Sequence, residues 1–600
     1  MIYVFADCQL DTCLYALYRA GRLWRLRPKV YRVLTYLLLH RDRVVSKQEL
    51  CEQIWGARAI SDGAIENTMQ AIRRATGDNG RKQQIIQTSY GHGYRFVAPV
   101  TVAPTTETDT APIDDRRALP SASRPQAMRP HKTPGNTQPH QHIARLLTTQ
   151  FPDMVATHPA LLAYHYTAAG HLHQAILCWQ QAGQQALERS AYPEAVASFT
   201  QGLALLHTLP NTPEQTRQEL VLQCRLALPL SVLGSALPEV EQIYTRALDL
   251  SHQVGTPQDV AFVLLGLARL YDRRGAFGTA RAFAEQLLSV SQHLRAPALL
   301  LWSHNTLGHI LMRLGEFTSA RQHLEAGLSY YDAQQHCLYT GQYGVDPGLD
   351  GLGALSWTLW YLGYPEQALQ RSREAMQLAQ TFAHPYSLGI TLTYAAALHA
   401  LRQEWHLVQE RAEALRQLAT TYGFAKLLAS ATRYQGMALF WQNPSAGLAR
   451  LEQGMAALQT LQAREARAAQ LAGLAHMYAH VGHIQAGVRL VQEAMTVAHH
   501  TGERCAEARR YCTMGELLQR QTPTDGRQAE SCLQQALTIA QRQHARAWEL
   551  QAAMSLSRLW QQQGKRFAAR ELLAAVYARF TEGFTTLDLQ QARILLEQLA

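Results

Sequence analysis

The sequence predicts a mainly α protein with a small α+β domain at the N-terminus and a long all-α array of helical hairpins behind it. Residues 28 to 97 contain three short helical patterns followed by a hairpin pattern. From residue 144 to the end, helical patterns follow one another with a recurring turn signature. Between them, residues 101 to 142 are rich in Pro, Thr, Ser and His and lack apolar periodicity. We therefore expect domains at residues 1–100 and 144–600, joined by a flexible linker over 101–143.

Two of the helical patterns have clear beginnings. Pro28 opens the first pattern, as suits a residue whose missing amide hydrogen is not needed at a helix start. Its apolar residues recur at helical spacing and predict one buried face: Val30, Leu34, Leu37 and Leu38. Ser46 and Glu49 have the spacing of a capping box, in which each side chain accepts the other residue's amide hydrogen. A second helix should therefore begin there, with Leu50 facing inward.

The third pattern, residues 62 to 75, has an apolar stripe and a polar face. Ile65, Met69 and Ile72 form the stripe, and Asn67, Gln70, Ala71 and Arg74 fall opposite, flanked by Thr68 and Arg73. Amide side chains can pair with adenine and guanidinium groups with guanine in the major groove. Taken alone, the same pattern suits a solvated amphipathic helix. The hairpin over residues 87 to 96 completes the layout of a winged helix, and this context favours DNA.

The positive charge is concentrated in this N-terminal domain. Residues 1 to 100 contain 15 Lys and Arg against 8 Asp and Glu, which gives +7 of the net +10 of the whole chain. Such a local field favours binding to a phosphate backbone. By itself it also fits RNA or an acidic membrane surface.

The order of the motifs separates these alternatives. The first 100 residues resemble the OmpR/PhoB-type winged-helix DNA-binding domain, on the strength of Leu26-Arg27-Pro28-Lys29, Val44-Val45-Ser46-Lys47-Gln48-Glu49-Leu50, Ile54-Trp55-Gly56, Ile72-Arg73-Arg74 and Gly91-His92-Gly93-Tyr94-Arg95-Phe96. The resemblance implies a short sheet before the three helices, which fits residues 3–5 and 14–18. It also implies that the third helix reads bases and that the hairpin, or wing, contacts phosphate or the minor groove.

The resemblance also assigns roles to particular residues. Base reading falls on Asn67, Thr68, Gln70 and Ala71, phosphate contacts on Arg73 and Arg74, and wing contacts on Thr88 and Tyr90. The loop before the third helix, Ala57, Arg58, Ala59 and Ile60, would face RNA polymerase. Relatives often carry Arg where this chain has Gln70 and Ala71, which leaves the operator sequence open but not the binding mode.

The C-terminal region carries a turn signature in which a glycine is followed five residues later by an alanine, usually with a bulky residue between. It occurs at Gly170 and Ala175, Gly275 and Ala280, Gly315 and Ala320, Gly363 and Ala368, and Gly564 and Ala569, with variants at Ser190 and Gly482. The glycine ends one helix in a left-handed conformation, the bulky residue packs over the turn, and the alanine lets the next helix approach closely. Stacked hairpins of this kind predict a superhelical solenoid with a concave surface.

This region resembles the tetratricopeptide portion of large bacterial regulators that are often called predicted ATPases. The matching segments include Leu162-Ala163-Tyr164-His165-Tyr166-Thr167-Ala168-Ala169-Gly170, Gly363-Tyr364-Pro365-Glu366-Gln367-Ala368 and Trp560-Gln561-Gln562-Gln563-Gly564-Lys565-Arg566. In those relatives a nucleotide-binding domain commonly precedes the repeats. This chain has no Gly-x-x-x-x-Gly-Lys-Ser/Thr loop, so we expect the NTPase domain to be missing and no nucleotide cofactor.

No motif indicates catalysis or a metal site. The nine cysteines are scattered and form no Cys-x-x-Cys pair. The group His499, His500, Glu503 and Cys505 fits a solvated helix end better than a metal site. We therefore expect no enzyme activity, no metal and no cofactor.

The expected function is sequence-specific transcription regulation. The chain lacks a signal segment and an apolar span long enough for a bilayer, so we expect a cytoplasmic protein with no membrane partner. Its partners would be double-stranded DNA, RNA polymerase, and a protein or small-molecule effector at the repeats, which could also assemble homo-oligomers. The alternatives are a non-catalytic tetratricopeptide interaction scaffold and an accessory subunit of a separate signalling ATPase. A discrete operator would favour the regulator over the scaffold.

Overall fold

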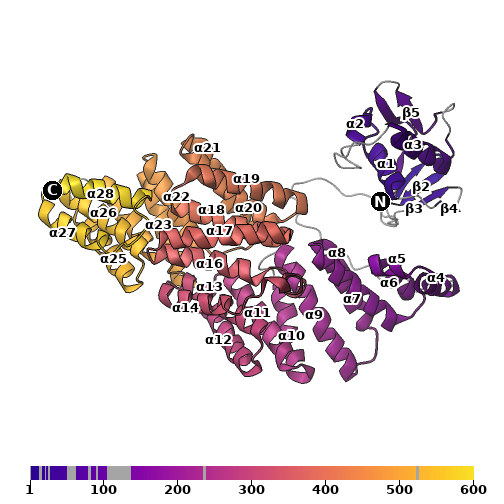
Figure 1. Cartoon of the computed structure of the whole chain (residues 1–600), viewed down its shortest axis with the longest axis horizontal. Helices are drawn as coiled ribbons and strands as arrows, with labels where there is room; N and C mark the ends of the chain where they lie inside the picture. The colour runs from indigo at the N-terminus through magenta and orange to yellow at the C-terminus, as the bar shows by residue number, and fades with distance from the viewer. Residues whose placement is uncertain are drawn as a thin grey trace, which may run out of the picture. The chain divides into compact units, whose positions relative to one another are not determined.

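A computed structural model describes residues 2–11, 16–19, 22–24, 28–50, 62–78, 83–89, 92–103, 137–233, 238–521 and 526–600 (Figure 1). The chain divides into two compact units, one ending at His131 and the other beginning at Lys132. Within the described ranges, no helix combines the length and apolarity needed to cross a membrane.

The N-terminal unit contains a five-stranded antiparallel sheet in the order β4-β3-β2-β1-β7. Its strands are β1 (Ile2–Phe5), β2 (Cys8–Asp11), β3 (Ala16–Arg19), β4 (Arg22–Trp24) and β7 (Thr101–Ala103). Tyr3 of β1 lies opposite Leu10 on one side and Val102 on the other. The prediction that the linker begins at residue 101 is therefore wrong, because β7 pairs with β1 and extends the first domain.

Three helices and a hairpin complete this unit: α1 (Pro28–Leu39), α2 (Lys47–Leu50), α3 (Asp62–Thr76), β5 (Ile86–Ser89) and β6 (Gly93–Phe96). The apolar stripes predicted for the first and third helices are buried. They consist of Val30, Leu34, Leu37 and Leu38 in α1, and of Ile65, Met69 and Ile72 in α3. Phe5 of the sheet meets Phe96 of the hairpin edge to face at 5.1 Å between ring centroids. One core thus joins the sheet, the helices and the hairpin.

The predicted capping box is only half correct. The Ser46 hydroxyl accepts the Glu49 amide hydrogen at 3.0 Å, as predicted. The Glu49 carboxylate instead accepts hydrogen bonds from Tyr36 at 2.8 Å and from Arg43 at 2.6 and 2.8 Å. The bonds from Arg43 lower the pKa of Glu49 to about 2, so this carboxylate stays ionised and ties α2 to α1.

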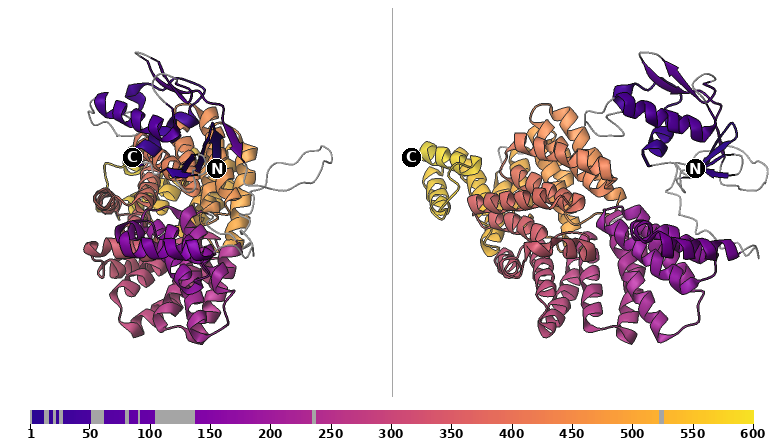
Figure 2. Two further views of the ribbon diagram at one scale, coloured as in Figure 1. Left: turned by 90° about the vertical axis from the view of Figure 1, so that its right-hand side faces the viewer. Right: turned by 45° about the vertical axis from the view of Figure 1, so that its right-hand side comes forward.

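The second unit is an all-α, tetratricopeptide-like solenoid of paired helices (Figures 1 and 2). Its helices are α4 (Thr137–Gln150), α5 (Pro152–Thr157), α6 (Pro159–Ala168), α7 (Leu172–Glu188), α8 (Tyr192–Leu206), α9 (Pro213–Leu233), α10 (Pro238–Val254), α11 (Pro257–Arg273), α12 (Phe277–Leu294), α13 (Pro297–Arg313), α14 (Phe317–Leu328), η2 (Ala333–Gln335), α15 (His336–Tyr343), α16 (Pro347–Tyr361), α17 (Pro365–Phe382), α18 (Pro385–Leu401), α19 (Trp405–Tyr422), α20 (Ala425–Phe440), α21 (Pro444–Thr460), α22 (Arg467–His480), α23 (Ile484–Thr501), α24 (Glu507–Gln521), α25 (Arg527–Arg542), α26 (Arg546–Gln562), α27 (Arg566–Tyr577) and α28 (Leu587–Leu599). Because α4 begins at Thr137, the prediction that the linker extends to residue 143 is wrong.

The turn signature has the predicted geometry. The glycines at 170, 275, 315, 363 and 564 have φ values of +79°, +73°, +77°, +85° and +77°, in the left-handed region. The alanines five residues later are all 0% exposed. Phe277 and Phe317 are buried as well, but Phe567 is 82% exposed, so the prediction that the bulky residue packs over the turn is wrong at this last signature.

The solenoid winds back onto itself, so that loops are hydrogen-bonded to the ends of helices far away in the sequence. The Arg464 amide donates to the Arg273 carbonyl at 2.9 Å, and the Arg504 amide donates to the Arg313 carbonyl at 2.8 Å. Both pairs are 191 residues apart. Helices α16 and α26 also contact each other. Each of these two later loops therefore rests on the C-terminal end of a helix in the preceding superhelical turn.

Glu503, which the sequence placed near His499, His500 and Cys505, takes part in the contact between the two superhelical turns. Glu503 is 0% exposed, and its carboxylate accepts the amide hydrogens of Ala468 and Ala469 at 3.1 and 2.9 Å, at the start of α22. Cys505 is 1% exposed. The expectation of a solvated helix end is therefore wrong for these two residues, because the adjoining loop packs against Arg313. Among the described residues, no three His, Cys, Asp or Glu side chains come together as metal ligands would.

A second contact closes the superhelix near its C-terminal end. The Glu582 carboxylate accepts the amide hydrogens of Glu366 and Gln367 at 2.9 and 3.1 Å, in the first turn of α17. The Glu366 carboxylate in return accepts the Gly583 amide hydrogen at 3.1 Å. Amides in the first turn of a helix have no partner within the helix, so Glu582 supplies one from 215 residues away.

We expect Glu582→Ala to expose the start of α17. Amide hydrogen exchange of a peptide covering residues 365–370 should become about tenfold faster, the factor that losing roughly 1.4 kcal/mol of hydrogen-bond energy gives. Glu571→Ala, at an exposed position of α27, is the matched control and should leave exchange unchanged. Unchanged protection in the Glu582 variant would show that this contact does not hold the two superhelical turns together.

Candidate nucleic-acid interface

Helix α3 presents an exposed polar stripe on a buried base. Glu66, Gln70 and Arg74 are exposed and lie four residues apart, which places them on one face of the helix. The opposite face supplies Ile65, Met69 and Ile72 to the core, each no more than 1% exposed. Because the apolar face fixes the rotation of α3, the stripe faces away from the core.

The other predicted base-reading residues are less uniform. Asn67 belongs to α3, but its side chain lies outside the described residues. Thr68 and Ala71 are half-buried, and Ala71 packs against the core. Gln70 is therefore the predicted base reader whose described side chain is most open to a ligand. Residues Ala57, Arg58, Ala59 and Ile60 and the wing residue Tyr90 lie outside the described residues.

Arg73 connects α3 to the wing. Its Nη2 donates to the Thr88 hydroxyl at 2.7 Å and to the Ile86 carbonyl at 3.0 Å, both on β5. Its Nε is buried without a partner. Sequence reasoning assigned Arg73 to phosphate and Thr88 to the wing surface but did not foresee that they bind each other. This contact holds the predicted recognition helix and the wing in one arrangement.

A buried carboxylate that sequence reasoning missed anchors the start of the wing. Asp78 accepts the amide hydrogens of Gln84, Ile85 and Ile86 at 3.0, 3.0 and 2.9 Å. It is 9% exposed and follows α3 directly after Gly77. In the sequence, Asp78 is marked only as an acidic residue beside a helix-ending glycine. Its hydrogen-bond partners lie six to eight residues further along the chain, so this local pattern does not indicate them.

The end of the wing depends on Gly93. Val45 and Tyr94 exchange backbone hydrogen bonds of 2.8 and 2.9 Å, which join the hairpin to the segment before α2. Gly93 has φ of +137°, and a Cβ atom there would lie 2.0 Å from the Val45 carbonyl oxygen. Only glycine fits this approach without moving the backbone. Gly93 of the predicted hairpin motif is therefore required by the geometry of the wing.

Lys47 and Arg95 are two further charged residues at the border of the interface. Lys47 of α2 binds Glu66 at 3.2 Å, which offsets the negative charge on the exposed stripe. Arg95 is exposed on β6 and donates to the carbonyls of Arg41 and Asp42, both at 3.4 Å. Sequence reasoning singled out neither Glu66 nor Arg95.

The N-terminal unit is similar to known transcriptional regulatory proteins. Residues 21–96 match the family model described as "Transcriptional regulatory protein, C terminal". The chain is 34% identical over 99 residues to the transcriptional regulator HilA of Salmonella typhi, a match that covers 16% of this chain and 18% of HilA. It is 27% identical over 77 residues to the phosphate regulon regulatory protein PhoB of Pseudomonas aeruginosa, covering 13% of this chain and 33% of PhoB.

The solenoid resembles solved helical-repeat proteins more distantly. The Rap conjugation gene regulator of the plasmid pLS20, solved in complex with the Phr* peptide, is 15% identical, with 54% of this chain and 89% of that chain covered and a TM-score of 0.40. The matches to HilA and PhoB span a third or less of those proteins, so they bear on the first domain alone. The N-terminal unit is an OmpR/PhoB-type winged-helix domain, joined in this chain to an all-α solenoid of paired helices.

Proposed function

We propose that this chain is a sequence-specific DNA-binding transcription regulator, in which α3 reads duplex DNA and the solenoid receives the controlling signal. The observation that carries the proposal is the exposed stripe of α3, which presents Gln70 and Arg74 on a helix fixed by the core and by the contact of Arg73 with the wing. An amphipathic helix of this kind, held rigidly beside a hairpin, suits the major groove.

Each proposed contact follows from the chemistry of its side chain. Gln70 is exposed and can bind adenine through two hydrogen bonds. The family resemblance adds Asn67, Thr68 and Ala71 of the same helix to the proposed base contacts. Arg74 is exposed and can pair with a phosphate. Arg73 acts chiefly by positioning the wing, and Thr88, which accepts from Arg73, keeps its hydroxyl hydrogen to donate to phosphate. Tyr90 completes the proposed set.

Further partners are proposed for the loop before α3 and for the solenoid. The loop Ala57–Ile60 precedes α3, at the position that faces RNA polymerase in the family resembled. The solenoid would bind a protein or small-molecule effector or form homo-oligomers, since stacked helical hairpins create an extended concave surface. A protein that acts on DNA in this way would work in the cytoplasm and needs no catalytic step.

The two neighbouring arginines should respond differently to substitution. Arg74→Ala should weaken the binding of the intact chain to duplex DNA and reduce the slope of log K against log salt by about 1, as the loss of one phosphate contact does. Its folding should be unaffected because the side chain is exposed. Arg73→Ala should weaken binding too, but with faster amide exchange over residues 86–89, because β5 loses two hydrogen bonds.

Fluorescence anisotropy at several salt concentrations and exchange measured by mass spectrometry test both variants. A variant at Arg416, which pairs with Glu413 on the solenoid, controls for loss of positive charge alone. Binding that depends neither on salt nor on Arg74 would reject the proposed interface.

Gln70→Ala should change specificity more than affinity. Removal of a bidentate contact to one base should cost about 1–3 kcal/mol on the preferred sequence and little on sequences altered at that base pair. The measurement is selection from a randomised DNA pool, once with the wild-type chain and once with the variant. The two selected motifs should differ at one position. Identical motifs would assign base reading to other residues.

A further inference from the structure

The interior of the solenoid contains a cavity of about 470 Å³. Its walls come from helices between α11 and α28, so both superhelical turns contribute to it. A volume of this size suits a small organic molecule. The loop contacts at Arg273 and Arg313 close the wall between the two turns.

The cavity is lined by aromatic rings on which arginines are stacked. The guanidinium carbons of Arg313, Arg433 and Arg509 lie 5.6, 3.9 and 5.3 Å from the ring centroids of Trp357, Tyr434 and Trp548, respectively. Within the described part of the chain, none of these three arginines has a carboxylate within ion-pairing distance of 4.0 Å. Arg313 is 7% exposed, and its Nε is buried without a hydrogen-bond partner, as is the Nε of Arg433.

The carboxylates of the cavity are mostly engaged with other groups. Glu465 pairs with Lys426. Glu516 accepts from Ser555 at 2.7 Å, and Asp588 accepts from Gln403 and Gln551 at 2.7 and 3.0 Å. The lining contains seven Lys and Arg against five Asp and Glu, so the unpaired arginines leave the cavity with an excess of positive charge.

The cavity lining also offers hydrogen-bond acceptors, although they are fewer than the arginine donors. One carboxylate oxygen each of Asp272 and Glu465 is buried without a partner. A molecule that satisfies this lining therefore needs an anionic group for the arginines, a planar ring for the aromatic walls and at least one hydrogen-bond donor.

The arginines come from both superhelical turns. Arg313 lies at the end of α13 and Arg509 lies in α24. Burial raises the pKa of Tyr361, and the positive charges of Arg313 and Arg509 both oppose that rise, so the two guanidinium groups lie near the same buried ring. An anion held between them would join the two turns.

We propose that this cavity binds a small organic anion, a carboxylate or a phosphate, that carries a planar ring and a hydrogen-bond donor, and that Arg313, Arg433 and Arg509 hold its anionic group. This proposal rests on the effector-binding role proposed for the solenoid and names the chemical class of the effector. Binding to the arginines of both turns stabilises the closed superhelix, because the ligand adds contacts between α13 and α24 that the free chain lacks.

A matched pair of probes tests the site in the full-length chain. 8-Anilino-1-naphthalenesulfonate has an anionic group, fused rings and an N–H donor, and N-phenyl-1-naphthylamine has the same rings and donor without the sulfonate. We expect the sulfonate to bind at least about tenfold more tightly, as roughly 1.4 kcal/mol from a charged hydrogen bond would give. Arg433→Gln and Arg509→Gln should each abolish most of this preference and leave binding of the neutral probe unchanged.

Further variants separate recognition from folding. Arg509→Lys keeps the charge but loses the planar fork, so it should give an intermediate affinity for the sulfonate. Arg416→Gln, which removes a partly exposed arginine outside the cavity lining, should match the wild type. Circular dichroism of each variant should show unchanged helix content.

Competition then distinguishes the two natural sources of the anion. Nucleoside monophosphates represent ring-bearing phosphates, and indole-3-carboxylate represents ring-bearing carboxylates. Displacement of the sulfonate by one class identifies the source. Equal affinity for the two probes, full retention of sulfonate binding in both glutamine variants, or displacement by peptides alone would each overturn the proposal. Because no DNA is present, these results are independent of whether the winged helix reads an operator.

Discussion

Backbone hydrogen bonds between residues 191 positions apart make the solenoid a closed superhelix. In an open repeat protein each hairpin contacts only its neighbours, and stability is a sum of local terms. Here the carbonyl of Arg313 accepts the amide hydrogens of both Arg504 and Cys505, at 2.8 and 3.1 Å. The buried Glu503 beside them caps α22. The cavity exists because these contacts bring the second turn against the first.

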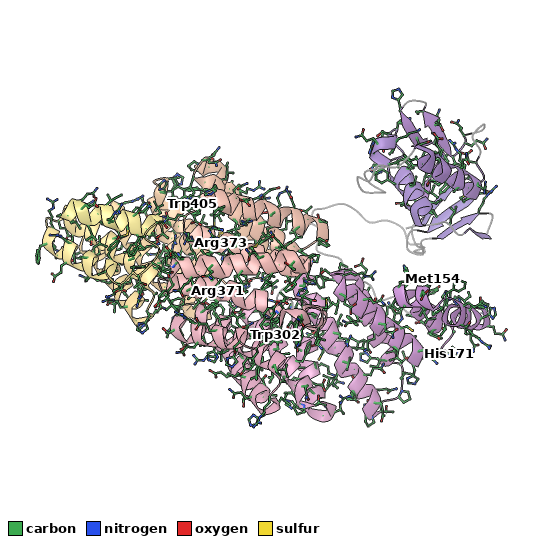
Figure 3. All side chains as sticks on the ribbon, in the orientation of Figure 1. Met154, His171, Trp302, Arg371, Arg373 and Trp405 are labelled. Carbon is green, nitrogen blue, oxygen red and sulfur yellow. The ribbon has the colours of Figure 1, made fainter. Side chains whose placement is uncertain are left out.

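The closure also explains why aromatic side chains gather inside the solenoid. Trp302, labelled in Figure 3, is fully buried on α13, and Trp548 of α26 donates its Nε1 hydrogen to the Cys505 carbonyl at 2.9 Å. Trp405, also labelled there, stacks on Trp441 at 5.2 Å and lines the cavity. Trp548 is 2% exposed and is thus enclosed between successive turns, whereas Trp441 remains 39% exposed.

The sequence predicted what depends on local chemistry. The glycine-to-alanine signature located helix-ending turns correctly because a left-handed residue and a small neighbour act within a few positions. The closure was not predictable in this way, since nothing near Arg313 indicates that Arg504 will meet it. Phe567 is 82% exposed, whereas Phe277 and Phe317 are buried. Phe567 lies three residues after its glycine, and the two buried phenylalanines lie two residues after theirs.

At the candidate DNA-binding site, too, the sequence predicted local features but not contacts between distant residues. Apolar periodicity oriented α3 and identified Gln70 and Arg74 as exposed. It missed the bond from Arg73 to Thr88 and the three amides held by Asp78, because each depends on how the wing folds back. It also ended the domain too early, since the pairing of β7 with β1 spans the whole winged helix.

A genome-wide map of binding by the intact chain tests the central claim most directly. If α3 reads DNA, the map should show sharp sites that share one sequence motif beside particular genes. A chain carrying both Gln70→Ala and Arg74→Ala should lose those sites while the protein remains folded and abundant. Binding spread over the genome without a shared motif, or sites that persist in the double variant, would contradict the claim.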